Sequence, residues 1–95
     1  MFVSIVIATR NRSVLLGRTL DALARQHWPR DGMEVIVADN GSADSTRAVV
    51  TAAQTAGLPV QYLFVAQPGK SHAVNAALRL TRGDLIAFKI GRAHV

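Results

Sequence analysis

Two polar segments of the chain each follow an apolar run that has the composition of a β-strand. Ala8-Thr9-Arg10-Asn11 comes after residues 2–7, and Asp39-Asn40-Gly41-Ser42 comes after residues 33–38. Between them they carry a guanidinium, a carboxylate, amides and hydroxyls, all of which can hydrogen-bond to a nucleotide. In an open parallel α/β sheet the ligand crevice lies beyond the carboxyl ends of the strands. The two segments are therefore predicted to lie where a nucleotide would bind.

Two common nucleotide-binding motifs fit this chain poorly. A dinucleotide-binding dehydrogenase needs Gly-x-Gly-x-x-Gly after the first strand, but residues 9–13 contain no glycine. A P-loop needs Gly-x-x-x-x-Gly-Lys-Ser. Gly69-Lys70-Ser71 matches the end of that motif, whereas Phe64 stands where its first glycine is required. Both of these protein classes are therefore disfavoured.

Strands and helices alternate along the chain in the order that would position the polar segments. Apolar, β-rich runs predict strands at residues 2–7, 33–38, 60–65 and 84–88. The short connections between strands and helices imply parallel strands joined by right-handed crossovers. The predicted fold is therefore α/β, a Rossmann-like parallel sheet with the element order βαβαβαβ and the strand order 3-2-1-4.

Three helices are predicted between the strands from apolar residues at helical spacing. The first is expected to end near Gln26, with His27 and Trp28 covering its end. The residues predicted to face the core are Leu16, Leu20 and Leu23 in the first helix, Val49, Ala52, Ala53 and Ala56 in the second, and Ala73, Val74, Ala77 and Leu78 in the third.

The ends of these helices are predicted from capping residues. Ser13 is expected to cap the first helix, and Ser42 or Asp44 the second. Gly57-Leu58-Pro59 is expected to end the second helix, and Thr81-Arg82-Gly83 the third, because glycine readily adopts the backbone conformation that follows a helix.

Composition excludes several classes of protein. The 95 residues are enough for one small domain, and 49% hydrophobic with 18% charged residues is typical of a globular chain. The net charge of +5 comes from scattered Lys and Arg, which favours small anionic ligands over nucleic acid. Without cysteine the chain forms no disulfide, and no apolar run reaches the ~20 residues of a membrane span. A soluble protein of the cytoplasm that binds no nucleic acid is expected.

The last seven residues do not continue the pattern of the strand before them. Lys89-Ile90-Gly91-Arg92-Ala93-His94-Val95 resembles the translation of a common sequencing adapter. We therefore expect residues 89–95 to be a non-native tail and base the fold prediction on residues 1–88.

Four blocks of sequence, in order, resemble the family 2 glycosyltransferases. They are VSIVIATRNR (3–12), EVIVADNGSADST (34–46), GKSHAVNAAL (69–78) and RGDLIAF (82–88). The resemblance implies a GT-A fold and transfer of a sugar, with inversion, from a nucleotide-diphosphate donor to an acceptor. It also implies a divalent metal, Mg²⁺ or Mn²⁺, in the whole protein. Residues 1–88 would be the nucleotide-sugar-binding half of such a domain.

The resemblance also implies which residues bind the donor. The implied nucleotide-sugar-binding residues are Ala8, Thr9, Arg10, Asp39, Gly69 and Lys70. The first three would line the base and ribose, and Asp39 would accept a hydrogen bond from the base. Gly69 and Lys70 would lie near the donor phosphates, since glycine lets the backbone approach an anion and lysine supplies a positive charge.

Each assignment has a structural alternative that the sequence leaves open. Asp39 could form a polar turn with residues 40–42 and cap the next helix. The other open cases are Arg10 and Arg12, which could be surface charges, and Asn11 and Asn75, which could brace loops through bonds to the backbone.

Two features of the family are absent from this chain. In the family, an Asp-x-Asp motif that binds metal and diphosphate follows the fourth strand, and a later carboxylate acts as general base; neither occurs in these 95 residues. No catalytic or metal-binding residue is therefore assigned, and His72 has no second ligand at metal spacing. The chain alone is expected to bind no metal and to be inactive.

The expected partners are a nucleotide-sugar donor and an acceptor that the sequence does not identify: a glycan, a lipid or a small molecule. The resemblance is compatible with a whole protein that associates with the inner face of a membrane. The alternative function is a small, non-catalytic nucleotide-binding or interaction module.

Overall fold

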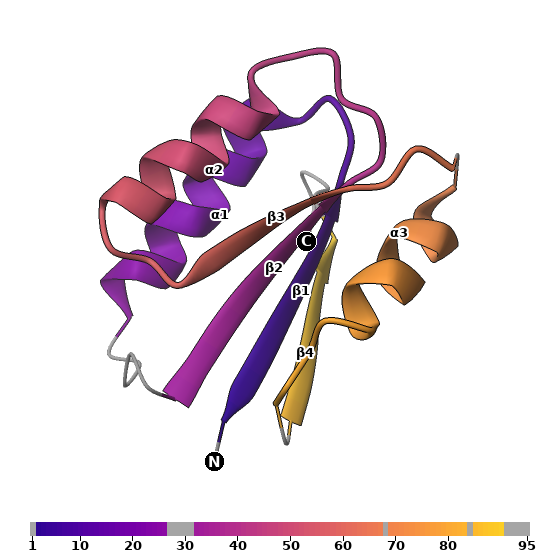
Figure 1. Ribbon diagram of the computed structural model, residues 1–95. Coiled ribbons are helices and arrows are strands. Elements are labelled where there is room, and N and C mark those ends of the chain that lie inside the picture. Colours follow the sequence, from indigo (N-terminus) through magenta and orange to yellow (C-terminus); the bar gives the residue numbers. More distant parts are fainter. Residues whose placement is uncertain (1, 27–31, 68, 84, 91–95) are drawn as a thin grey trace.

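Strands and helices alternate along the chain in a computed structural model that describes residues 2–26, 32–67, 69–83 and 85–90 (Figure 1). The elements are β1 (Val3–Thr9), α1 (Ser13–Arg25), β2 (Met33–Asp39), α2 (Thr46–Thr55), β3 (Val60–Phe64), α3 (Lys70–Leu78) and β4 (Leu85–Ile90). The predictions for His27, Trp28 and residues 91–95 lie outside the described residues.

All strand pairs of the described sheet are parallel, and their order is β3-β2-β1-β4. The predicted α/β class with a parallel sheet is confirmed. Three strands run further than the sequence indicated: β1 continues through Ala8 to Thr9, β2 continues to Asp39, and β4 continues past Phe88 to Ile90. The expectation that residues 89 and 90 do not continue the last strand is therefore wrong, since they pair with Ile7 and Ala8 of β1. Thr9 and Asp39 are register partners in the β1–β2 ladder, so ladder pairing holds them in strand conformation.

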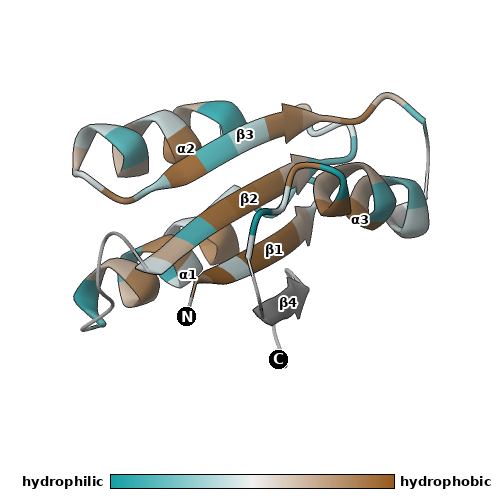
Figure 2. Cartoon of the chain, turned by 60° about the horizontal axis from the view of Figure 1, so that its bottom comes forward, coloured by the Kyte–Doolittle hydropathy of each residue, from teal (hydrophilic) through white to brown (hydrophobic). Residues whose placement is uncertain are grey.

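Helices cover both faces of the sheet: α1 and α2 lie on one face and α3 lies on the other (Figure 1). Every residue of β1 and β2 is buried, as expected for strands covered on both sides. Figure 2 shows these two strands as mostly hydrophobic, whereas the helices alternate between hydrophobic and hydrophilic residues.

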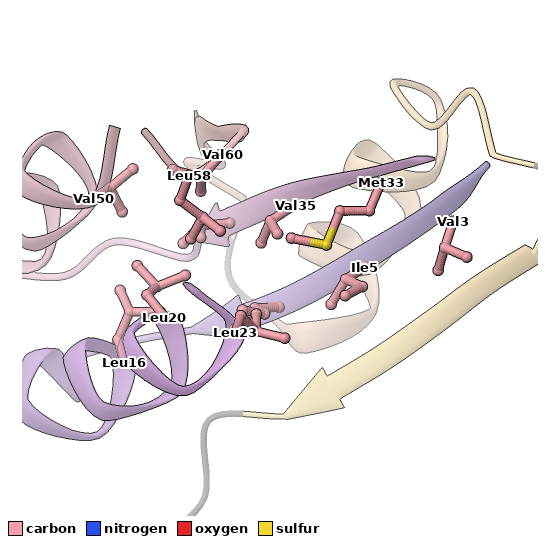
Figure 3. Packing of buried hydrophobic residues seen from close by; sticks show 12 residues of the cluster. Val3, Ile5, Leu16, Leu20, Leu23, Met33, Val35, Val50, Leu58 and Val60 are labelled. Carbon is pink, nitrogen blue, oxygen red and sulfur yellow. The ribbon is translucent and has the colours of Figure 1, made fainter. Parts of the chain in front are cut away.

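Two hydrophobic clusters fill the layers on either side of the sheet. The larger contains Ile5, Val35 and Val60 from the strands and the predicted leucines of α1, and it packs between the sheet and the two helices α1 and α2 (Figure 3). The smaller contains Val6, Ala8, Ile36, Ala38, Val65, Ala73 and Ala77, and it packs under α3. Since successive side chains of a strand point to opposite faces, membership of a cluster tells which face each strand residue occupies.

The buried stripe of α2 differs from the predicted one by about one residue. Thr46 and Val50 are buried and Val49 and Ala53 are partly buried, whereas Ala52 and Ala56, which were predicted to face the core, are exposed. Small alanine side chains on two sides of this helix leave its orientation poorly defined by the sequence. In α3 the predicted face is correct, with Ala73 and Ala77 fully buried.

Three of the capping predictions are wrong. Ser13 is the first residue of α1 rather than its cap, and its backbone N–H donates to Asp44 Oδ2 at 3.1 Å. Gly83 does not end α3, which ends at Leu78. The cap position of α2 is Ser45, neither Ser42 nor Asp44, although Asp44 Oδ1 accepts from the backbone N–H and from the hydroxyl of Thr46. Gly57, at a φ of 100°, follows the end of α2 as predicted.

The amino-terminal end of the sheet is closed by a buried carboxylate. Glu34 Oε2 accepts from the Ser4 hydroxyl at 2.6 Å and from the Arg82 backbone N–H at 2.8 Å. The Gly83 N–H in turn donates to Ser4 Oγ at 2.8 Å. A Cβ atom added to Gly83 would lie 2.6 Å from the Ser4 backbone nitrogen, so Gly83 is required for a close approach. No helix within the described ranges is long and apolar enough to cross a membrane.

Candidate functional site

The carboxyl ends of β1, β2 and β3 lie side by side, and the loops after them gather at the same end of the sheet (Figure 1). Asp39 pairs with Thr9 on one side and with Phe64 on the other. The ladder continues one bond further, from Asn40 N–H to Thr9 O at 2.9 Å and from Val65 N–H to Asp39 O at 2.8 Å. We call this end of the sheet the rim. It brings Thr9 and Asp39 together, as predicted.

Asp39 is almost completely buried at the rim, with 2% of its surface exposed. Its Oδ1 accepts from the Ser42 backbone N–H at 2.9 Å, and its Oδ2 accepts from the Tyr62 hydroxyl at 2.6 Å. The bond to Ser42 closes a polar turn over residues 39–42, which is the structural alternative for Asp39. A direct contact of this carboxylate with a nucleobase stays a prediction.

Tyr62 is the aromatic partner of Asp39, and the sequence reasoning missed it. Burial and the hydrogen bond to the Asp39 carboxylate raise the pKa of Tyr62 to about 12, so the hydroxyl keeps its proton at neutral pH. The Arg47 guanidinium lies over the ring, 5.4 Å from its centre. Tyr62 thus links β3, the end of β2 and the first turn of α2.

Residues 8 and 9 face opposite sides of the sheet. Ala8 belongs to the cluster under α3, whereas Ile7 belongs to the cluster under α1 and α2. By the alternation of strand side chains, Thr9 and Asp39 therefore face α1 and α2, away from α3. The Thr9 hydroxyl is buried and has no hydrogen-bond partner among the described residues. The residues predicted to bind the nucleotide-sugar donor therefore lie on both faces of the sheet, with Ala8 on the α3 side and Thr9 and Asp39 on the side of α1 and α2.

Asn40 is the polar side chain on the α3 side of the rim. Its Nδ2 donates to Val65 O at 3.1 Å and to Gln67 O at 2.6 Å, and its Oδ1 accepts from the Gly69 N–H at 2.9 Å. The sequence pattern predicts only a turn at Asn40. The alternation of strand side chains would have placed Asn40 and Asp39 on opposite faces of the sheet, but only if β2 had been predicted to extend to residue 39.

Gly69 stands at the N-terminus of α3 with a φ of 113°, a backbone conformation that residues with a Cβ rarely adopt. Its carbonyl accepts from the His72 and Ala73 N–H groups. Lys70 is the first residue of α3, and its side chain lies outside what the structure describes. Gly69 therefore precedes α3 and Lys70 begins it, and their place near the donor phosphates stays a prediction.

The remaining candidates are polar surface or loop residues. Arg10 and Arg12 are exposed and form no ion pair within the described residues. Asn11 has a φ of 52° and braces the loop after β2, since its Oδ1 accepts from the Ala43 N–H at 2.7 Å. His72 and Asn75 are exposed on α3.

The part of the chain that the structure describes contains no group of three His, Cys, Asp or Glu that could hold a metal ion. Asp44 is exposed, and the hydrogen bond from the Thr46 hydroxyl lowers the pKa of its carboxyl, so it is charged at neutral pH. The described rim offers a ligand hydrogen-bonding groups and charges.

A parallel sheet with helices on both faces and polar loops beyond its carboxyl ends defines an α/β domain of the kind that binds ligands at this edge. The chain belongs to glycosyl transferase family 2, whose family model matches residues 4–88. The sequence is 42% identical over 87 residues to validoxylamine A glucosyltransferase of Streptomyces hygroscopicus subsp. jinggangensis, covering 90% of this chain and 20% of that protein.

Solved structures of glycosyltransferases have the same fold. The mannosyltransferase PcManGT of Pyrobaculum calidifontis, in complex with GDP-Man and Mn²⁺, superposes with a TM-score of 0.87 at 30% identity, over 94% of this chain and 27% of that one. S. aureus TarS 1–349 in complex with UDP-GlcNAc gives a TM-score of 0.84 at 27% identity, over 96% of this chain and 26% of that one. The chain therefore spans about a fifth to a quarter of these proteins.

Proposed function

We propose that this chain is the donor-nucleotide half of a glycosyltransferase that moves a sugar from a nucleotide-diphosphate donor to an acceptor with inversion. The observation that carries the proposal is the rim, where polar loops after β1, β2 and β3 and the start of α3 meet at one end of a parallel sheet. The nucleotide sugars bound by the similar structures support it.

In this proposal the donor lies across the α3 side of the rim. The exposed Arg10 lines the base and ribose just beyond the buried Ala8, and Gly69 and Lys70 at the start of α3 lie near the diphosphate. Thr9 and Asp39 support this surface from the opposite face, where Asp39 closes the turn over residues 39–42. In the whole protein the strand order 3-2-1-4 forms the donor half of a GT-A domain over residues 1–88. Residues 89–95 are proposed to be non-native in sequence, although residues 89 and 90 take part in β4.

We further propose that the whole protein uses a divalent metal, supplied with ligands by residues that this chain does not contain. Such a metal would stabilise the departing diphosphate while a carboxylate accepts the proton of the acceptor hydroxyl. The Mn²⁺ in the mannosyltransferase complex supports this part of the proposal. We also propose that the whole protein is located in the cytoplasm, at the inner face of a membrane where the acceptor is a lipid.

The proposal is tested with a full-length protein that contains this chain. We expect it to release nucleotide diphosphate from UDP-glucose, UDP-N-acetylglucosamine or GDP-mannose in the presence of Mn²⁺ and an acceptor, and to lose this activity with a chelator. The anomeric configuration of the product, read by NMR, tests inversion. Turnover by residues 1–95 alone would overturn the assignment of the chain as an incomplete half.

A further inference from the structure

We propose that Asn40 is a positioning residue of the donor site, whose amide fixes Val65, Gln67 and Gly69 and thereby sets where α3 begins. The inference rests on the proposed function, and it adds a residue that neither the sequence reasoning nor the family resemblance assigned.

The chain after β3 leaves the sheet at Val65. Val65 makes the last main-chain bond to β2, from its N–H to Asp39 O at 2.8 Å. Beyond that bond the loop is exposed at Ala66, Gln67 and Gly69. The Asn40 side chain continues the ladder where the backbone of β2 has turned away, with bonds to residues 65, 67 and 69.

Only an amide satisfies these three contacts. Val65 O and Gln67 O need a donor, whereas the Gly69 N–H needs an acceptor, and the asparagine side chain offers both within one planar group. An ionised aspartate has the same shape but only acceptors, so one of its oxygens would face two carbonyl oxygens. A protonated aspartate regains a single donor.

The consequence for the site is geometric. Gly69 is the N-cap of α3, and its unusual φ of 113° is held by the bond from its N–H to Asn40 Oδ1 at 2.9 Å. A loop released at residues 67 and 69 would let the first turn of α3 shift relative to the rim. Any ligand that contacts both the first turn of α3 and the rim would then bind more weakly, although the core under Ala73 and Ala77 would remain intact.

The experiment compares wild-type chain with Asn40→Asp and Asn40→Ala, using UDP and GDP as probes and ¹H–¹⁵N chemical shifts as the readout. At about pH 7.5 we expect Asn40→Asp to bind the better of the two probes about tenfold more weakly than wild type, and Asn40→Ala about fivefold more weakly. The two facing carbonyl oxygens should raise the pKa of the new carboxyl above its ordinary value of about 3.9, so that it gains its proton at about pH 4.5. The ratio for Asn40→Asp should then fall to about threefold or less, while that for Asn40→Ala stays unchanged.

The matched control is Gln54→Glu, the same exchange of amide for acid at the other end of the sheet. Gln54 Nε2 also donates to a backbone carbonyl, Val60 O, at 3.0 Å. Loss of this hydrogen bond should leave the affinity for UDP and GDP within about twofold of wild type at both pH values. Asp39, Asp44 and His72, which lie around the rim and the start of α3, are present in every variant, so changes in their charge cancel in the ratio to wild type.

Amide hydrogen exchange at Gly69 separates failure of this inference from failure of the proposed function. The Gly69 N–H should be protected in wild type and should lose that protection in Asn40→Ala. Protection that is unaffected by the substitution would overturn the inference, as would variants that bind the probes like wild type. Wild-type chain that protects Gly69 but binds neither UDP nor GDP would instead overturn the proposed function.

Discussion

The two ends of the sheet are both held by polar side chains, but they are held in different ways. At the amino-terminal end, Glu34 is 8% exposed, and its carboxylate binds Ser4 and the backbone before β4. The rim also contains a buried carboxylate, Asp39, which accepts from Ser42 and Tyr62, but there the neutral amides of Asn11 and Asn40 additionally bind the backbones of exposed loops. Both ends thus hold a buried carboxylate, and only the rim surrounds it with exposed loops that a ligand can reach.

Because of this difference, substitutions at the two ends should have different effects on the free energy of unfolding and on nucleotide affinity. Hydrogen bonds to a buried charge are worth more than those between neutral groups, and a buried carboxylate without its donors is costly. Changes at the amino-terminal end should therefore lower the free energy of unfolding and leave nucleotide affinity alone. Changes at the rim should affect affinity with a smaller effect on stability.

The largest effect is expected for Gly83→Ala at the amino-terminal end. The new Cβ would lie 2.5 Å from Ser4 Oγ and 2.6 Å from the Ser4 backbone nitrogen, which forces the connection before β4 away from β1. We expect a loss of about 3 kcal/mol in the free energy of unfolding, measured by urea denaturation. The control is Gly17→Ala in α1, where the nearest atom is 3.6 Å away and a gain of about 0.5 kcal/mol is expected. Equal stability of the two variants would contradict the close approach at Gly83.

Glu34→Gln should have the next largest effect. Glutamine can place its carbonyl oxygen toward the Ser4 hydroxyl and the Arg82 N–H, but it carries no negative charge to strengthen those bonds. We expect a loss of about 2 kcal/mol by urea denaturation. The affinity for UDP should not change. A fall in that affinity would contradict the prediction that the amino-terminal end affects stability alone.

Tyr62→Phe tests the stability of the rim itself. Removing the hydroxyl takes a donor from Asp39 Oδ2 and should cost about 1 kcal/mol at neutral pH. The pKa of Tyr62 is raised from 10.0 to about 12 in the folded chain, so the unfolded chain loses its proton first. The stabilisation from this shift is complete below pH 10.0 and is lost as the pH rises through about 12.

The chain contains one tyrosine, so the ultraviolet absorbance of the phenolate reports Tyr62 alone. A midpoint near that of free tyrosine in the folded chain would show that the bond to Asp39 does not form. Tyr62→Phe should also lack the fall in stability that wild type shows between pH 10.0 and about 12.

Asn11→Ala should have the smallest effect. It removes the acceptor for the Ala43 N–H and places alanine at a φ of 52°, for a combined loss of somewhat less than about 1 kcal/mol. Asn11→Gly keeps the backbone conformation and is the matched control. If both variants lose the same stability by urea denaturation, the positive φ contributes nothing.

The sequence predicted the class of fold and the end of the sheet that carries the site, because both depend on local patterns. Apolar runs located β1 and β2, and the polar residues after them located the rim. The partners of Asn40 lie 25 to 29 residues further along the chain, and no local pattern encodes such a contact. The prediction for Gly83 failed for the same reason, since its constraint comes from Ser4 at the opposite end of the chain.

The buried hydroxyl of Thr9 is expected to lower the stability of this domain, because it has no hydrogen-bond partner among the described residues. Valine has the same outline, and a methyl group in place of an oxygen that lacks a partner among the described residues removes a desolvation cost. Whoever wishes to use this domain as a thermostable scaffold would begin with Thr9→Val.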